Sequence, residues 1–157
     1  MKFETSVVLL NKKCTQRCIF CSRDHRMAEH TPGQIEQIME QFSDSISFEG
    51  GEPTLFGGLL KWVRRAKAKK IKEIILLTNA ARFSDIAYIR KLLEAGVTMF
   101  NVNLPAHDER IFDALTQTKG GFKRRVEAVK NLIRVAGRDK VRLTLVVNSV
   151  MYRYLRD

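Results

Sequence analysis

Short apolar runs alternate along this chain with longer stretches in which apolar residues recur every three or four positions. The runs are rich in Val, Ile and Leu, and they have the length of strands buried on both faces of a sheet. They predict five strands, over residues 6–10, 45–48, 74–78, 100–104 and 141–147. A loop or a helical pattern follows each of the first four, so the chain is built from a repeated strand–helix unit.

The stretches between the strands show the 3.6-residue periodicity of helices that pack by one face. Four helices are expected: one that starts at Pro32 after an N-cap at Thr31, one over residues 59–70, one that Ser84 caps, and one that Gly137 ends. The apolar stripe of the last helix is Phe122, Val126, Val129 and Ile133. Strands that alternate with helices predict an α/β fold with a parallel sheet.

Polar residues occupy one face of the fourth predicted strand. Asn101 and Asn103 alternate with Phe100 and Val102, so the two asparagines share a face. An open sheet that helices cover on both sides needs two apolar faces. We therefore expect a curved parallel sheet, a partial (β/α) barrel with five β/α units, whose concave side lines a cavity. Functional residues are expected at the C-terminal edge of the strands, where the connecting loops gather.

The length and the apolar content fit one domain. With 157 residues, of which 45% are hydrophobic, the chain can bury a core of its own. We expect a single domain over residues 1–157. No apolar run approaches the roughly 20 residues of a membrane-spanning helix, and Glu4 stands where a signal peptide would have its apolar stretch. The sequence therefore predicts no membrane contact and a cytoplasmic location.

The chain is basic, and its charges are segregated. It carries 28 Lys and Arg against 17 Asp and Glu, a formal net charge of +11. Residues 27–60 contain acidic side chains but no Lys or Arg, whereas residues 61–72 contain basic side chains and no acid. We favour a solvated helix face as the explanation of the basic segment, with contact to nucleic acid or to an acidic protein as the alternative.

All three cysteines lie within eight residues, at Cys14, Cys18 and Cys21. Their odd number argues against a disulfide framework. Three thiolates on one short loop suit an iron–sulfur cluster that keeps one iron open for another ligand. They also suit a zinc site if His25 supplies the fourth ligand. In a third interpretation the cysteines share one stripe of a helix and pack in the core. The cysteines alone leave all three interpretations open.

A second motif, Gly50-Gly51-Glu52-Pro53, follows the second predicted strand. Two glycines at a strand end permit positive φ and let a ligand approach the main chain without a Cβ in the way, and the proline holds the direction in which the chain leaves. On its own, such a motif is also an ordinary turn. Both motifs follow predicted strands, so both fall at the edge of the sheet where function is expected.

Together the two motifs resemble those of the radical S-adenosylmethionine (radical SAM) enzyme superfamily. Cys14, Cys18 and Cys21 match its three-cysteine signature, and residues 50–53 match its Gly-Gly-Glu motif. The resemblance implies that the three cysteines are the metal ligands of a 4Fe-4S cluster whose fourth iron binds S-adenosyl-L-methionine. It also implies the chemistry: an electron from the cluster cleaves this cofactor, and the resulting 5′-deoxyadenosyl radical abstracts a hydrogen atom from a substrate.

The resemblance further implies which residues meet S-adenosyl-L-methionine. Phe20, just before the third cysteine, would lie beside it, and the main chain of residues 50–52 would meet its amino group. The cofactor-binding residues expected on this basis are Phe20, Gly50, Gly51, Glu52, Pro53, Asn79, Asn103 and Asn148. For each asparagine, a structural role in a turn or at a strand end is the alternative.

Charge and chemistry indicate the partners. Three thiolates leave an oxidised cluster with a formal charge of about −1 and a reduced one with about −2, so basic residues around the cysteines favour reduction. The same residues offer a docking site for an acidic electron donor such as flavodoxin or ferredoxin. They are Lys12, Lys13, Arg17, Arg23 and Arg26. The substrate stays open, because a peptide, an RNA and a small molecule all remain compatible with the sequence.

Two features depart from the superfamily. Its core resembles a partial barrel of six strand–helix units, and this chain has five, so we expect the last strand and a C-terminal extension to be absent. Where several relatives carry an arginine after the fourth strand, this chain has Leu115 and Thr116. Two alternatives to an active enzyme core therefore remain: a zinc-stabilised basic module that binds nucleic acid, and a truncated, inactive homologue. His107 and Asp108 are expected in a loop at the mouth of the barrel.

Overall fold

The computed structural model describes residues 5–21, 28–41, 44–137 and 142–146, and it contains one parallel sheet. The strands are β1 (Thr5–Leu9), β2 (Ser45–Glu49), β3 (Glu73–Thr78), β4 (Met99–Asn103) and β5 (Arg142–Val146). They lie in the order of the chain, and every neighbouring pair is parallel. The five predicted strands and the open, partial-barrel α/β fold are confirmed, while residues 141 and 147 lie outside the described residues.

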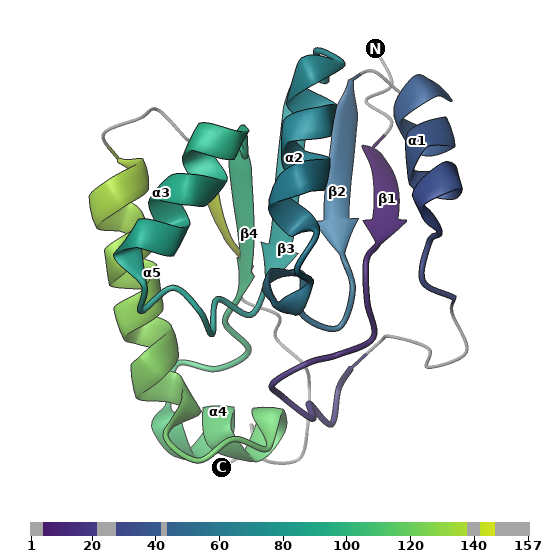
Figure 1. The fold of residues 1–157 in the computed structure, drawn as a ribbon. Helices are drawn as coiled ribbons and strands as arrows, with labels where there is room; N and C mark the ends of the chain where they lie inside the picture. The colour runs from purple at the N-terminus through teal and green to yellow at the C-terminus, as the bar shows by residue number, and fades with distance from the viewer. Residues whose placement is uncertain (1–4, 22–27, 42–43, 138–141, 147–157) are drawn as a thin grey trace.

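Helices connect the strands (Figure 1). They are α1 (Pro32–Gln41), α2 (Leu59–Ala68), α3 (Ile86–Ala95), α4 (Glu109–Thr116) and α5 (Gly121–Ala136), with a short 3-10 helix, η1 (Pro53–Leu55). α2 and α3 stand in front of the sheet in this view, and α1 stands beside β1 at the right. α5 packs against α3, and α4 lies below the ends of the strands. None of the helices in the described part of the chain has the length and apolar character needed to span a membrane.

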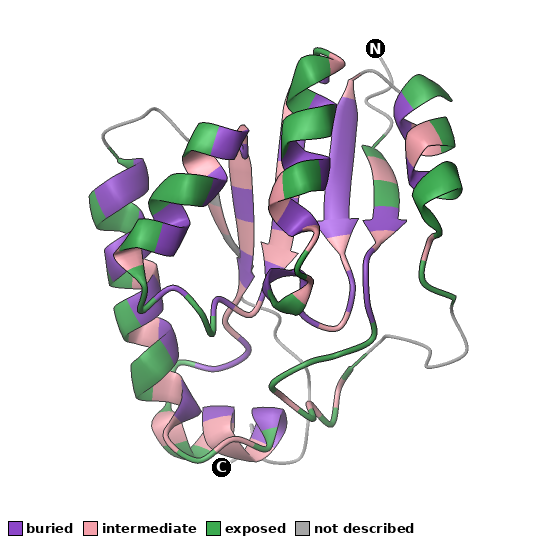
Figure 2. Cartoon of the chain, in the orientation of Figure 1, coloured by how far each residue is buried: buried purple, intermediate pink, exposed green. Residues whose placement is uncertain are grey.

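The core fills the space between the sheet and the helices. On β3 and β4 the buried side chains alternate with half-buried ones, and Figure 2 shows this banding along both strands. Phe100 and Val102 are fully buried on the helix-covered side, whereas Asn101 and Asn103 are half-buried on the other side. The predicted polar face of the sheet is therefore confirmed on β4. Every residue of β2 except Glu49 is buried, as expected for a central strand.

Two details of the predicted helices are wrong. Asp85, and not Ser84, caps α3, because Asp85 stands immediately before the first helical residue and its carboxylate accepts from Tyr88 N at 3.1 Å. In α5 the buried face is rotated by about one residue from the predicted stripe, and Ile133 is 55% exposed. The buried face includes Arg125 and Asn131. Because the prediction placed this face from apolar residues alone, it could not recognise a face that also carries polar residues.

The helix α4 is a feature that the sequence did not predict. Residues 105–121 were expected to be a loop, but residues 109–116 form two turns of helix. Asp108, expected at the mouth of the barrel, is instead the N-cap, and its carboxylate accepts from Ile111 N at 3.0 Å. Phe112 and Leu115 are fully buried beneath the helix. Eight residues give too few repeats for the periodicity to be recognised.

Ion pairs between α1 and α2 account for the segregated charges. Arg65 of α2 lies 2.8 Å from Glu36 of α1, and Lys69 lies 3.4 Å from both Glu36 and Glu40. Lys72, after α2, pairs in the same way with Asp44 at 2.7 Å. The acidic and the basic segments are thus neighbours in space. This arrangement favours the solvated helix face over a surface for nucleic acid.

Candidate functional site

The loop that follows β1 carries the three cysteines, and we call residues 11–21 the cysteine loop. Cys14 and Cys21 are exposed, Cys18 is half-buried, and all three are free. The interpretation in which they pack as a helical stripe in the core is therefore wrong. Within the described ranges, no three His, Cys, Asp or Glu side chains are grouped closely enough to hold a single metal ion. His25 lies outside the described residues.

The Gly-Gly motif holds the cysteine loop against the end of β2. Gly51 N donates to Asn11 O, and Glu52 N donates to Lys13 O, each at 2.6 Å. A Cβ on Gly51 would lie 2.1 Å from the carbonyl oxygen of Lys13, a distance that real Cβ atoms do not adopt. Glycine is needed here because a second segment of main chain comes close. The sequence alone predicted the close approach of a ligand.

The carboxylate of Glu52 is fully buried and joins the ends of β2 and β3. It accepts four hydrogen bonds, from Thr54 N (3.1 Å), Thr54 Oγ1 (2.6 Å), Thr78 Oγ1 (2.6 Å) and Asn79 N (2.7 Å). Such donors are what a buried carboxylate needs to offset its lost hydration. The side chain of Glu52 is thus used inside the protein, and Pro53 begins η1 directly after it.

Asn79 reaches the cysteine loop from the end of β3. Its Nδ2 donates to Thr15 Oγ1 at 3.1 Å and to Cys14 Sγ at 3.5 Å. Its Oδ1 accepts from Ala81 N at 2.9 Å. The side chain therefore has the turn role that the sequence left as one alternative, and it also lies beside the first cysteine.

The helix α4 supports the cysteine loop from the other side. The last carbonyls of α4 accept from the loop: Arg17 N donates to Thr116 O at 3.2 Å, and Ile19 N donates to Leu115 O at 2.9 Å. Phe20 packs against a small apolar cluster that contains Phe112 and Leu115. These carbonyls lack partners within their own helix, so the loop satisfies them and is held in place at the same time.

Arg125 of α5 is a site residue that sequence reasoning missed. It is only 4% exposed. Its Nη1 donates to Asn103 O, and its Nη2 donates to Gln16 Oε1 at 3.3 Å. Its guanidinium carbon lies 5.4 Å from the centre of the Phe112 ring. Arg125 precedes Ala128 and Leu132 at helical spacing, and all three are buried on the same face of α5. This spacing is the sequence signal that could have identified Arg125.

Electrostatic effects link Arg125 to the cysteines. Burial, followed by the nearby thiolates of Cys14 and Cys21, raises the pKa of the Cys18 thiol to about 11, and Arg125 opposes this shift. Burial lowers the pKa of Arg125 to about 10, which leaves its guanidinium charged at neutral pH. Cys18 therefore lies close enough to the other two cysteines to feel their charges, and the cation beside it favours its thiolate form.

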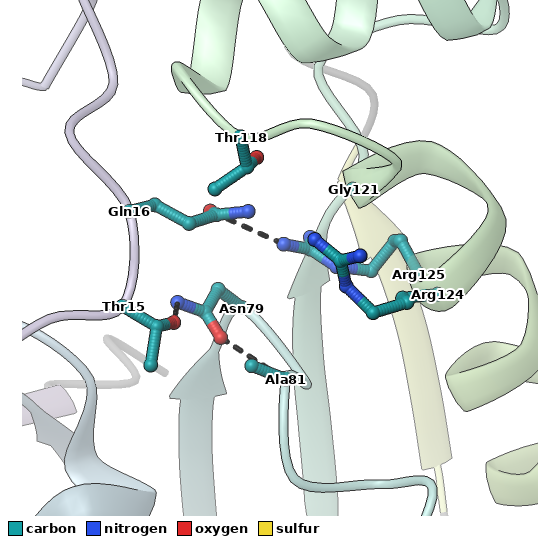
Figure 3. A pocket seen from close by; sticks show the side chains of 8 residues that line it. All are labelled: Thr15, Gln16, Asn79, Ala81, Thr118, Gly121, Arg124 and Arg125. Atoms are coloured by element: carbon teal, nitrogen blue, oxygen red, sulfur yellow. Dashed lines mark hydrogen bonds between the residues drawn. The ribbon is translucent and has the colours of Figure 1, made fainter.

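A pocket of about 210 Å³ opens beside the cysteine loop (Figure 3). It is lined by Thr15, Gln16, Asn79, Ala81, Thr118, Gly121, Arg124 and Arg125. The side chains of Arg124 and Arg125 point toward each other and toward Gln16 in this view. None of the lining residues is acidic. The pocket is thus positively charged and suits an anionic group.

The remaining predicted site residues are placed less directly. Asn103 ends β4 half-buried, and its main-chain oxygen accepts from Arg125. Asn148 lies outside the described residues, as do Arg23 and Arg26. Lys12, Lys13 and Arg17 are exposed on the cysteine loop.

Comparisons with known proteins agree with this geometry. The family model of the Radical SAM superfamily matches residues 8–155. A protein of Sulfurisphaera tokodaii named "Probable GTP 3',8-cyclase" is 31% identical over 149 residues, which cover 90% of this chain and 46% of that protein. A second protein of the same name, from Saccharolobus solfataricus, is 28% identical over 90% of this chain and 47% of its own length. The chain thus spans about half the length of the curated relatives it matches.

Solved structures show the same fold. Streptococcus suis SuiB bound to S-adenosylmethionine superimposes with a TM-score of 0.72 at 20% identity, over 96% of this chain and 34% of SuiB. BtrN in complex with AdoMet and 2-DOIA superimposes with a TM-score of 0.62 at 23% identity, over 95% of this chain and 58% of BtrN. At these identities the likeness concerns the fold, and in both structures that fold accompanies bound S-adenosylmethionine.

Proposed function

This chain belongs to the radical SAM superfamily, and we propose that it forms a radical SAM core in which Cys14, Cys18 and Cys21 hold a 4Fe-4S cluster beside a binding site for S-adenosyl-L-methionine. The observation that carries the proposal is the position of the cysteine loop. Three free cysteines are fixed at the C-terminal edge of the sheet, next to a positively charged pocket.

The residues present fit the cluster. Thiolates are the ligands that iron–sulfur clusters use, and three of them leave one iron of a cubane open. When bound, the cluster supplies one electron for the reductive cleavage of S-adenosyl-L-methionine, which yields methionine and a 5′-deoxyadenosyl radical.

The other site residues bind and orient the cofactor. Gly51 N and Glu52 N are already used to hold the cysteine loop, and Glu52 O already accepts from Asn11 Nδ2 and Leu55 N. The carbonyl oxygens of Gly50 and Gly51 are therefore the groups that would accept from the amino group of S-adenosyl-L-methionine. The guanidinium groups of the pocket suit its carboxylate. The residues proposed for the cofactor remain Phe20, Gly50, Gly51, Glu52, Pro53, Asn79, Asn103 and Asn148.

Reconstitution with iron and sulfide in the absence of oxygen tests the proposal. We expect a brown protein with about four irons per chain that releases 5′-deoxyadenosine when reduced in the presence of S-adenosyl-L-methionine. Serine in place of any one of Cys14, Cys18 or Cys21 should lower the bound iron and abolish release, whereas Lys91→Ala, an exposed change on α3, should leave both unchanged.

Two other results would contradict the proposal. A colourless protein that retains zinc would favour the zinc-stabilised module. A brown protein that releases no 5′-deoxyadenosine would favour an inactive homologue.

GTP is the substrate we propose to test first, because the two curated relatives described above are named GTP 3',8-cyclases. If GTP is the substrate, its addition should raise 5′-deoxyadenosine release above the substrate-free rate, and ATP should not. The exposed Lys12, Lys13 and Arg17 support the proposal that an acidic flavodoxin or ferredoxin delivers the electron. Free cysteines fit a reducing compartment such as the cytoplasm, which is the location we propose.

A further inference from the structure

Gln16 links a buried arginine to two of the three cysteines. Its main-chain N donates to Cys14 Sγ at 3.4 Å, and its Oε1 accepts from Cys18 Sγ at 3.7 Å. The same Oε1 accepts from Arg125 Nη2 at 3.3 Å. A single glutamine therefore lies between the guanidinium group on α5 and the sulfurs on the cysteine loop.

Arg125 is buried, and its hydrogen-bond partners in the described part of the chain are neutral. They are Asn103 O and Gln16 Oε1, and the face of the Phe112 ring lies beside the guanidinium. Among the described residues, no Asp or Glu lies within ion-pair distance of it, although the charge of the buried Glu52 carboxylate acts on it from farther away, as do the thiolates of Cys18 and Cys14. A buried cation without a direct ion pair is costly to retain, so further negative charge on the sulfurs would stabilise it.

The three sulfurs are the place where such charge would appear. A cluster held by three thiolates takes up one electron from a low-potential donor: the donor is oxidised by one electron, the cluster is reduced by one, and no protein bond is made or broken. The added negative charge interacts most strongly with a cation in a region of low dielectric. Lys12, Lys13 and Arg17 are exposed, and water and salt screen their charges.

We propose that Arg125 is a positioning residue for the cysteine loop and the buried positive charge that makes the bound cluster easier to reduce. This inference rests on the proposed function and adds a redox role to it. It assigns the role to a residue that matches neither of the two sequence motifs.

Arg124 provides a matched control. It lines the same pocket and carries the same charge, but its side chain is exposed and donates to Lys119 O at 2.8 Å. Arg124→Met therefore removes one positive charge from the pocket and leaves the bonds between Arg125 and Gln16 in place. Arg125→Lys keeps the positive charge but loses the planar set of N–H donors of the guanidinium group, and Arg125→Met removes the charge and the donors together.

The test is a redox titration of the reconstituted cluster, followed by its EPR signal and carried out without S-adenosyl-L-methionine. We expect Arg125→Met to shift the midpoint potential to a more negative value, Arg125→Lys to restore most of the shift, and Arg124→Met to change it less than Arg125→Met does. Equal potentials for the Arg125→Met and Arg124→Met proteins would overturn the proposed redox role.

Positioning is tested on the metal-free protein by hydrogen exchange at the amides of Arg17 and Ile19. Exchange should become faster in Arg125→Met. It should also become faster in Gln16→Leu, a variant that loses the hydrogen bond between Gln16 and Arg125 but keeps the positive charge of Arg125. Exchange in Arg124→Met should be the same as in the wild-type protein. Unchanged exchange in the first two variants would overturn the positioning role. If Arg125→Met does not fold, Arg125→Gln, which also removes the charge, replaces it in the redox titration, and Gln16→Leu carries the positioning test.

These outcomes separate the inference from the function on which it rests. A wild-type protein that takes up no cluster would refute the proposed function and, with it, the redox role. A wild-type protein that binds the cluster, with variants that leave the potential and the exchange unchanged, would refute the inference alone.

Discussion

Glu52 illustrates how one side chain can build a site without facing it. Its carboxylate is fully buried and accepts four hydrogen bonds from three residues at the ends of β2 and β3. One of those donors is the main-chain N of Asn79, whose side chain contacts Cys14. Glu52 therefore fixes the position of a residue that touches the cysteine loop.

We expect Glu52→Gln to lower the free energy of unfolding by about 2–3 kcal/mol, the scale of hydrogen bonds to a charged group. The amide keeps one acceptor but turns the other into a donor, which then faces donors. Urea unfolding of the metal-free protein measures the change. Glu94→Gln, the same substitution on the exposed face of α3, is the control. A loss at Glu52 no larger than at Glu94 would show that the carboxylate is dispensable.

At the scale of residues, the sequence was sufficient to find the motifs of the site, but it was less able to predict the role of each residue. The spacing of Cys14, Cys18 and Cys21 indicated a site but left its nature open, the resemblance implied a cluster, and the structure places the three residues on a loop at the expected edge. The glycine motif was identified for the approach of a ligand, but Gly51 is needed for the approach of Lys13 O. Arg125 was missed because its role comes from a contact with Gln16, 109 positions earlier, which a local pattern does not contain.

At the scale of elements, α4 is the part that the sequence failed to predict and that the site depends on. Its last turn accepts hydrogen bonds from Arg17 N and Ile19 N, and its apolar side packs on Phe20. The other elements were predicted well because ten or more residues of helical periodicity, or an unbroken apolar run, give a clear signal. A helix of eight residues is held by its tertiary contacts rather than by its own periodicity.

We expect Phe112→Ala to lower the free energy of unfolding by about 3–5 kcal/mol, as for other large core side chains. The ring is fully buried, packs edge-on against Phe122 at 5.8 Å between centroids, and lies under the guanidinium of Arg125. Limited proteolysis should then cut the cysteine loop faster. Ile133→Ala, on the exposed side of α5, should change stability by less than about 0.5 kcal/mol.

The two substitutions differ mainly in burial, so equal losses of stability would mean that α4 is not packed as described. Slower cleavage of the loop in the Phe112→Ala protein would contradict the supporting role of α4.

At the scale of the whole molecule, the core and the cysteine loop are largely separate. The main cluster of buried side chains runs from β1 to β4 and includes residues of α1, α2, α3 and α5, but it contains no cysteine. The parallel direction of the strands follows from the alternation of strands and helices, and the polar face of β4 indicated the partial barrel, which is why the sequence was sufficient to predict the fold. The sequence did not allow the long-range contacts of single polar residues, such as Asn79 and Arg125, to be predicted.

Removal of a reconstituted cluster by chelation should therefore leave the fold intact. We expect the far-UV circular dichroism spectrum to be unchanged, with a lower Tm because ligand binding to the native state stabilises it. Loss of the helical signal together with the iron would contradict the separation of core and loop. Serine at all three cysteine positions should give the same spectrum as the chelated protein.

The distance in sequence between Gln16 and Arg125, 109 residues, also bears on biosynthesis. The cysteines leave the ribosome long before α4 and α5, whose contacts hold their loop, have been made. Until then the thiols stand unprotected on a growing N-terminal fragment, where oxygen can convert them to sulfenic acid. Iron delivery to this polypeptide is therefore best timed after translation has passed the second half of the domain.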